Sequence, residues 1–141
     1  MQRILVVDDM ATNRELLRNI LEDDFAIETA ENGESALIKL QEYGEDMAAV
    51  LLDLQMPKMD GFAVIATMKR NGWLNKIPVL IISSEHAAEI ENGCLELGVS
   101  DFIHKPFDAS IVRNRVKNTL DLFAYKNRLE ETVEKQRKTL R

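Results

Sequence analysis

The sequence predicts a doubly wound α/β fold, in which helices cover both faces of a parallel β-sheet. Five short apolar runs with the character of buried strands alternate with segments whose apolar residues recur at helical spacing. The runs lie at 3–7, 25–29, 49–53, 78–83 and 101–104, and the helical segments between them lie at 12–22, 33–43, 60–70 and 87–97. Regular alternation of this kind is typical of βαβ units, which build parallel sheets.

Each helical segment has an apolar stripe or a recognisable end. The stripes of the first three segments consist of Leu16, Leu17, Ile20 and Leu21, then Ala36, Leu37 and Leu40, then Phe62, Ile65, Ala66 and Met68. Gly72 and Gly98 follow the third and fourth segments, where a helix is expected to stop. Gly93 lies inside the fourth segment, where glycine costs about 1 kcal/mol relative to alanine. We therefore expect the fourth helix to be frayed or mobile around Gly93.

The order of the strands follows from the rules for such connections. Right-handed crossovers and short loops favour a flavodoxin-like sheet of order 2-1-3-4-5. In this arrangement ligands bind beyond the carboxyl ends of the strands, near the point where the strand order reverses. The residues at these ends with polar or charged side chains are Asp8, Asp9, Asp53, Ser83 and Lys105. The sequence thus brings three carboxylates, a hydroxyl and an ammonium to one edge of the sheet.

This set of side chains suits phosphoryl transfer with a divalent cation. Mg²⁺ prefers oxygen ligands and commonly takes one or two carboxylates together with phosphate oxygens. A carboxylate can also attack phosphorus and become an aspartyl phosphate. We expect Asp8 and Asp9 to hold Mg²⁺ and Asp53 to act as the nucleophile. Lys105 would pair with the phosphoryl oxygens, and Ser83 would donate a hydrogen bond to them.

Composition excludes several other classes of protein. A chain of 141 residues fits one domain with an extension, and its net charge of −6 argues against nucleic-acid binding by this segment. No apolar stretch approaches the roughly 20 residues that span a bilayer, and the N-terminus does not read as a signal peptide. Cys94 is a single cysteine and forms no internal disulfide. We therefore expect a cytoplasmic protein that contacts neither membrane nor nucleic acid.

The C-terminal segment from residue 108 predicts one long helix, because it contains neither glycine nor proline. Asp108 or Ser110 suits its N-cap. The apolar residues expected to pack its first half on the sheet are Ile111, Val112, Val116, Leu120 and Phe123. A helix of this length extends beyond the domain, so we expect one folded domain at 1–123 and a projecting extension at 124–141.

The extension repeats apolar residues at coiled-coil spacing. The stripe consists of Leu122, Leu129, Val133 and Leu140. Lys126 and Gln136 fill the positions between them and weaken a zipper. A parallel coiled coil would make a homodimer through residues 111–141, whereas a solvated single helix or linker explains the same pattern. The sequence leaves both interpretations open.

Four motifs resemble the receiver domain of two-component response regulators. They are Ile-Leu-Val-Val-Asp8-Asp9, Leu-Leu-Asp53-Leu-Gln-Met-Pro57-Lys-Met-Asp60-Gly61, Pro-Val-Leu-Ile-Ile-Ser83 and Asp101-Phe-Ile-His-Lys105-Pro106-Phe107. The resemblance covers about residues 2–123. It implies that Asp53 accepts a phosphoryl group from a sensor histidine kinase or phosphotransfer protein. It also implies Mg²⁺ bound by Asp8, Asp9, Asp53 and the main-chain carbonyl of Gln55, and a cis peptide bond between Lys105 and Pro106.

The resemblance further implies a conformational switch. Ser83 and Phe102 fall on the family's two switch positions, a hydroxyl and an aromatic ring that reorient together. Ser83 would move toward the phosphoryl group, and Phe102 would turn inward. The surface formed by the fourth helix, fifth strand and fifth helix would then change and control an output domain or effector protein.

Other functions are weaker alternatives. A phosphatase of the haloacid dehalogenase type needs an acidic residue two positions after its nucleophile, and Gln55 occupies that position after Asp53. A degenerate receiver that binds proteins without phosphorylation is disfavoured because all five site positions are filled. A stand-alone relay receiver remains open. We expect no enzyme beyond the chain's own phosphoryl transfer and dephosphorylation.

Overall fold

The computed structural model contains a five-stranded parallel sheet in the order β2-β1-β3-β4-β5, which confirms the predicted topology. It describes residues 1–56, 58–84 and 88–139. The strands are β1 (Arg3–Val7), β2 (Ala26–Ala30), β3 (Met47–Asp53), β4 (Val79–Ser83) and β5 (Asp101–His104). The helices are α1 (Ala11–Leu21), α2 (Gly33–Tyr43), α3 (Gly61–Arg70), α4 (Ala88–Leu97) and α5 (Ala109–Thr139), with 3₁₀ turns η1 (Gly44–Asp46) and η2 (Trp73–Asn75).

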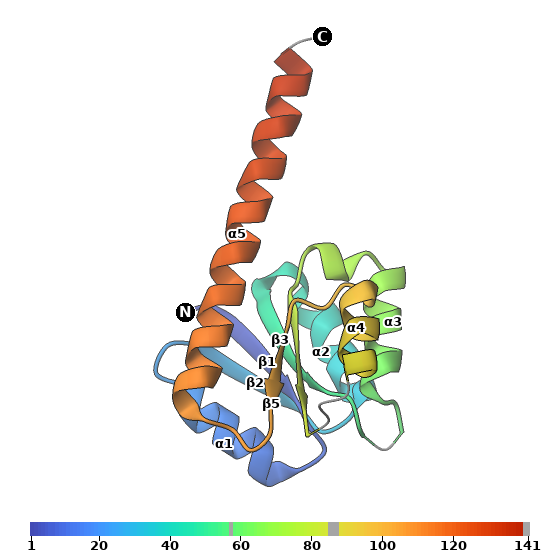
Figure 1. Cartoon of the computed structure of the whole chain (residues 1–141), viewed down its shortest axis with the longest axis vertical. Helices are drawn as coiled ribbons and strands as arrows, with labels where there is room; N and C mark the ends of the chain where they lie inside the picture. Colours follow the sequence, from blue (N-terminus) through green and yellow to red (C-terminus); the bar gives the residue numbers. More distant parts are fainter. Residues whose placement is uncertain (57, 85–87, 140–141) are drawn as a thin grey trace.

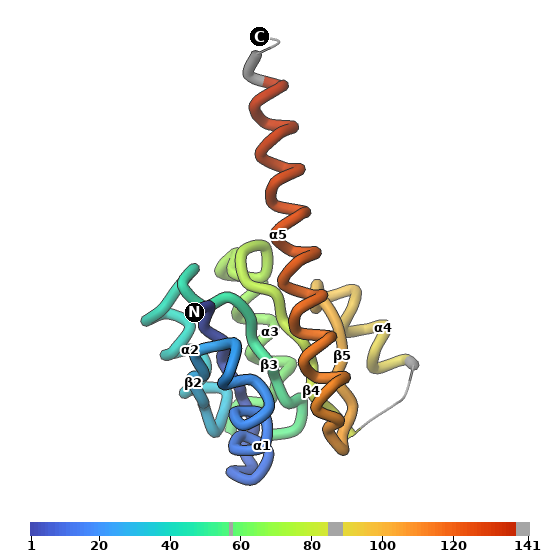
Figure 2. Tube along the Cα trace, turned by 90° about the vertical axis from the view of Figure 1, so that its left-hand side faces the viewer, coloured from blue at the N-terminus to red at the C-terminus, as the bar shows by residue number. Residues whose placement is uncertain are grey.

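The sheet is covered on both faces. Helices α1 and α5 lie on one face, and α2, α3 and α4 lie on the other (Figure 1 and Figure 2). One core lies under α1 and α5 and includes Ile4, Val6, Leu51 and Val116. The other includes Leu5, Val7, Leu52, Ile65 and Cys94. Neighbouring residues of β1 and β3 thus enter opposite cores, which explains why these strands read as continuous apolar runs.

Helix ends follow the sequence signals. The Asp60 carboxylate accepts a hydrogen bond from the Ala63 N–H at 2.9 Å, and the Asp108 carboxylate accepts one from the Ile111 N–H at 3.1 Å. Asp108 is therefore the cap of α5, and Ser110 lies inside the helix. After α3 and α4, Gly72 and Gly98 adopt φ of 75° and 110°, the left-handed conformation expected at a helix stop.

The long helix α5 leaves the domain and projects beyond it (Figure 1). In its first half, Val112 and Val116 are fully buried against the sheet. Ile111 is 50% exposed, so the expectation that it packs on the sheet is wrong, because its side chain points about 100° away from that of Val112. Beyond the domain, Leu129 and Val133 are about half exposed. Leu140, the last residue of the predicted stripe, lies outside the described residues.

Helix α4 runs without a break from Ala88 to Leu97, across Gly93. The expected fraying is therefore not seen in the secondary structure. A Cβ atom added at Gly93 would meet no heavy atom within 4 Å. The glycine is thus not required for packing, and its cost to the helix remains.

Gly93 and Gly61 both lie in helices but differ in the space around them, so replacement by alanine should change the free energy of unfolding in opposite directions. Gly93→Ala should raise the free energy of unfolding by about 1 kcal/mol, because it removes backbone freedom from the unfolded helix. Gly61→Ala, in the first turn of α3, should lower it by roughly 1–3 kcal/mol through overpacking. Its Cβ atom would lie 2.5 Å from the Asp53 carbonyl oxygen. Urea unfolding of both variants measures the difference, and changes of the same sign would contradict it.

Candidate phosphoacceptor site

Three carboxylates meet where β1 and β3 end side by side. Residues Val7 and Leu52 pair across these strands, and each is followed by an aspartate. Oxygen atoms of Asp8, Asp9 and Asp53 all lie within 4.8 Å of one another. Asp8 is fully buried and Asp53 is 4% exposed, while Asp9 faces solvent. The sequence prediction that the carboxyl ends of the strands bring these side chains together is confirmed.

An ammonium group stands between the two buried carboxylates. Lys105 Nζ lies 3.3 Å from Asp8 Oδ2 and 3.5 Å from Asp53 Oδ2. The Lys105 backbone N–H donates to the Ser83 carbonyl at 2.9 Å, which fixes the chain as it leaves β5. The bond from Lys105 to Pro106 is cis, as the resemblance implies. One cation therefore balances part of the charge of two buried anions.

The electrostatic balance at Asp53 favours the protonated form more than in water. Burial raises the pKa of the Asp53 carboxyl, and the negative charge of Asp8 raises it further. The Gln55 backbone N–H, which donates to Asp53 Oδ1 at 3.2 Å, and the Lys105 ammonium oppose this pKa shift without cancelling it. The positive groups around the Asp53 carboxylate thus do not fully compensate its negative charge and its burial. A cation bound beside it would supply what the protein does not.

Above Asp53 lies an open hollow of about 630 Å³. Its lining includes Asp9, Asn13, Gln55, Ser83 and Lys105. Ser83 is 7% exposed and ends β4, next to β3 in the sheet. Carboxylate oxygens at the floor, a lysine at one wall and a hydroxyl at another leave room for an anionic group of phosphoryl size.

The proposed switch aromatic lies away from this hollow on the neighbouring strand. Phe102 of β5 pairs with Ile81 of β4, while Ser83 pairs with His104. The Phe102 ring is half-buried and packs against the core under α2, α3 and α4. Ser83 and Phe102 are therefore close in the sheet without forming one site in this state.

Sequence reasoning missed two residues that hold Asp8. Asn13 Nδ2 donates to Asp8 Oδ2 at 3.2 Å, and Arg14 Nη1 donates to the Asp8 main-chain carbonyl at 2.6 Å. The Met10 N–H completes the set, since it donates to Asp8 Oδ1 at 2.9 Å. Both side chains come from the first turn of α1, one turn after the Asp-Asp pair. This proximity was the available signal.

The loop after Asp53 is held close to the strand end. The Gly61 N–H donates to the Leu54 carbonyl at 3.1 Å, so the start of α3 lies against the residue that follows the acceptor. Lys58 adopts φ of 67°, a left-handed conformation that costs a residue with a side chain. Pro57, part of the motif quoted above, lies outside the described residues. The loop thus combines a close backbone approach with a strained turn beside the site.

The donor set fits Mg²⁺. All three side chains offer hard oxygen atoms, and two of them are buried where water competes weakly. Sulfur and imidazole ligands, which zinc and copper prefer, are absent from this group of three. The arrangement can therefore bind a small divalent cation next to a carboxylate that is accessible from an open hollow.

The model of the response regulator receiver domain family matches residues 4–117. The chain belongs to this family. The match covers most of the described α/β body and ends within α5, before the projecting part of that helix. The family of two-component receivers predicted from the motifs is thus confirmed.

Individual relatives differ in length. The chain is 39% identical over 109 residues to a protein-glutamate methylesterase/protein-glutamine glutaminase of Treponema denticola, covering 74% of this chain and 28% of that protein. NtrX of Brucella abortus is 28% identical with a TM-score of 0.83, and the match covers 92% of this chain and 29% of that one. The chemotaxis protein CheY4 of Vibrio cholerae is 26% identical with a TM-score of 0.77, covering 84% and 98%. The chain spans 26–30% of the curated relatives it matches.

A search for membrane-crossing segments was negative: across the described ranges, no helix is both long and apolar enough to span a bilayer.

In the absence of divalent ions, replacing the charged side chain of Asp53 by a neutral one should stabilise the fold. Because the folded-state pKa of Asp53 is raised, its ionisation costs stability, and this cost appears as pH rises through the folded-state pKa. Asp53→Asn should therefore unfold at higher temperature than the parent at pH 7, with a smaller gap at acid pH. Thermal unfolding without divalent ions measures this effect.

The control for this prediction is Asp23→Asn, which removes the same charge from an exposed position. It should leave the unfolding temperature nearly unchanged. Added Mg²⁺ should stabilise the parent more than the Asp53 variant, since a cation binds the carboxylate that the variant lacks. Equal stabilisation of both proteins by Mg²⁺ would contradict the assignment of Asp53 as a ligand.

Proposed function

We propose that this domain accepts a phosphoryl group on Asp53 and transmits that event through its surface to an output domain or effector protein. The observation that carries the proposal is the Asp53 carboxylate itself. It lies beneath an open hollow, and its oxygen atoms are close enough to those of Asp8 and Asp9 to share a metal ion. Lys105 Nζ lies 3.5 Å from its Oδ2 atom. Membership of the receiver family supports a sensor histidine kinase or a phosphotransfer protein as the donor.

The transfer needs little from the protein besides placement and charge. A carboxylate oxygen of Asp53 forms a bond to phosphorus as the P–N bond of a phosphohistidine breaks, and the electron pair of that bond stays on the imidazole nitrogen. Lys105 is placed to pair with the phosphoryl oxygens, and the Ser83 hydroxyl to donate to one of them. Bound Mg²⁺, held by Asp8, Asp9, Asp53 and the Gln55 carbonyl, supplies neutralising charge.

The phosphoryl group changes the charge that the site must balance. It adds a charge of about −1.5 to −2 and three acceptor oxygens. We propose that Ser83 and Lys105 move toward these oxygens and that Phe102, on the adjacent strand, turns further into the core. The α4–β5–α5 surface would change with it. Because Phe102 has no hydroxyl, the switch at this position works through packing.

The extension is proposed as a helical linker. Of the extension expected at 124–141, residues 124–139 continue helix α5 out of the domain (1–123), so a shift of its first half would be carried along its length. The short share of the multidomain relatives that this chain covers supports a downstream module. The match to nearly all of CheY4 keeps a stand-alone relay receiver as the second candidate. In either case the domain is regulatory and catalyses only its own phosphoryl transfer and dephosphorylation.

The reducing cytoplasm is the compartment we propose for this exchange, because the one cysteine, Cys94, is a buried free thiol.

Intact mass spectrometry tests the central claim. After incubation with acetyl phosphate and Mg²⁺, the parent should gain the mass of one phosphoryl group, and Asp53→Asn should gain none. Asp9→Asn, which removes a solvent-facing ligand, should be labelled more slowly and recover at higher Mg²⁺ concentration. Labelling that persists in Asp53→Asn would move the acceptor elsewhere. A folded parent that gains no mass and binds no Mg²⁺ would leave a binding module without phosphorylation.

A further inference from the structure

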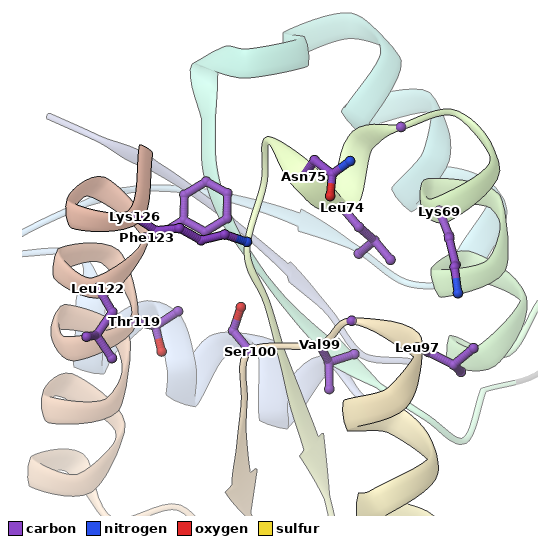
Figure 3. A pocket seen from close by; sticks show the side chains of 12 residues that line it. Lys69, Leu74, Asn75, Leu97, Val99, Ser100, Thr119, Leu122, Phe123 and Lys126 are labelled. Atoms are coloured by element: carbon purple, nitrogen blue, oxygen red, sulfur yellow. The ribbon is translucent and has the colours of Figure 1, made fainter. Parts of the chain in front are cut away.

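A second hollow, of about 580 Å³, lies at the opposite edge of the sheet from the acidic site. It is bounded by α5 where that helix leaves the domain and by the ends of α3 and α4 (Figure 3). Apolar side chains from η2, α4 and α5 line it: Leu74, Leu97, Leu122 and Phe123. Nothing in the phosphoacceptor function uses this surface.

Two lysines give the hollow its charge. Lys69 comes from the last turn of α3 and Lys126 from α5, and both line the space (Figure 3). Within the described ranges neither lysine is within ion-pair distance of a carboxylate, whereas other lysines of those ranges are. A segment that combines apolar and acidic side chains is therefore the natural complement of this hollow.

The projecting part of α5 carries such a segment. Leu129, Glu130, Val133 and Glu134 line one shallow hollow together with Arg137. Spacings of three and four residues place Leu122, Lys126, Leu129 and Val133 on one side of the helix. Three of these side chains are apolar yet 70%, 49% and 50% exposed, in the order Leu122, Leu129 and Val133. The helix thus presents a cation, Lys126, between apolar side chains, followed one turn later by an anion, Glu130.

We propose that this side of α5 is the interface between two copies of the chain, with the two helices antiparallel. The tail of each copy then enters the hollow of the other. A two-fold axis passing between residues 127 and 128 sets Leu122 opposite Val133 of the partner subunit. It also sets Lys126 beside Leu129 and Glu130 of the partner subunit. Each contact occurs twice, so the interface closes on itself as a dimer.

Charge decides between this arrangement and a parallel coiled coil. In a parallel, in-register homodimer every seam residue faces its own copy, so Lys126 would face Lys126 of the partner subunit. Opposed ammonium groups at a seam cost stability. The antiparallel arrangement instead pairs each Lys126 with an acidic residue. It also fills the apolar hollow at the base of α5, which a parallel zipper farther along the helix leaves open.

Single-cysteine crosslinking separates the two arrangements. Cys94 is fully buried, so cysteines introduced on α5 are the reactive ones. A mixture of the Leu122→Cys and Val133→Cys full-length variants, treated with a short bis-maleimide and no phosphoryl donor, should yield a covalent mixed dimer. Val133→Cys alone should yield none, because in the antiparallel dimer its two copies lie about 16 Å apart along the axis.

Either of two results would overturn the proposal. Self-crosslinking of Val133→Cys or of Leu122→Cys would show parallel helices. No crosslinked product in any sample, with a monomer in sedimentation, would show that the exposed stripe is solvated. Labelling of Asp53 is measured separately on the parent, so failure of the dimer leaves the phosphoacceptor assignment untouched.

A charge exchange provides an independent test that keeps every apolar contact. Lys126→Glu and Glu130→Lys should each weaken the dimer about tenfold, measured by sedimentation, because each brings like charges together twice. The double variant should recover most of the parent's affinity. Glu131→Lys, which makes the same change of charge on another side of the helix, is the matched control and should have little effect. If the double variant dimerised as weakly as the two single variants, the antiparallel pairing would be contradicted.

Discussion

The whole arrangement depends on two buried carboxylates that share one ammonium group. Asp8 and Asp53 lie at the ends of adjacent central strands, and burial together with the charge of Asp8 raises the pKa of Asp53. Lys105, contributed by a third strand, is close enough to both to hold them together. One cation for two anions leaves the site under-neutralised. This charge balance supports the proposal that a divalent cation binds beside Asp53 and that an anionic group can then be accommodated.

Placing these charges requires the parallel sheet and its loops together. Adjacent parallel strands bring Asp8 and Asp53 side by side although α1, β2 and α2 separate them in the sequence, and α1 supplies Asn13 and Arg14 to fix Asp8 at both its side chain and its main chain. Gly61 lets α3 start against the backbone of the acceptor. Each support comes from the element that directly follows the strand it serves. The floor of the site is therefore held by hydrogen bonds from α1 and α3, whereas the proposed switch residues lie on β4 and β5.

Most of the fold and the five charged or hydroxyl positions of the site were predictable, because strand periodicity and turn residues encode both strands and their ends. Asn13 and Arg14 were not, since which helical side chains face the site depends on how α1 is rotated on the sheet. The exposure of Ile111 has the same cause. The hollow at the base of α5 combines residues from α3, η2, α4 and α5, far apart in the sequence, so no local pattern marks it. That Lys69 and Lys126 lie near no carboxylate of the described ranges likewise emerges only from the three-dimensional arrangement.

Helix α5 is joined to strand β5 through the side chain of Arg115. Arg115 Nη1 donates to the Phe102 carbonyl at 2.8 Å and to the Asp101 carboxylate at 3.2 Å, which ties the strand that bears the switch aromatic to the helix that becomes the tail. A displacement of β5 is therefore imposed on α5 itself rather than on a flexible linker. In the proposed dimer the same helix lines the hollow that would receive the partner's tail, so the proposed shift at Phe102 would change the angle at which the two tails pack. The proposed dimer would then respond to the state of Asp53 without any contact between its interface and the hollow above Asp53.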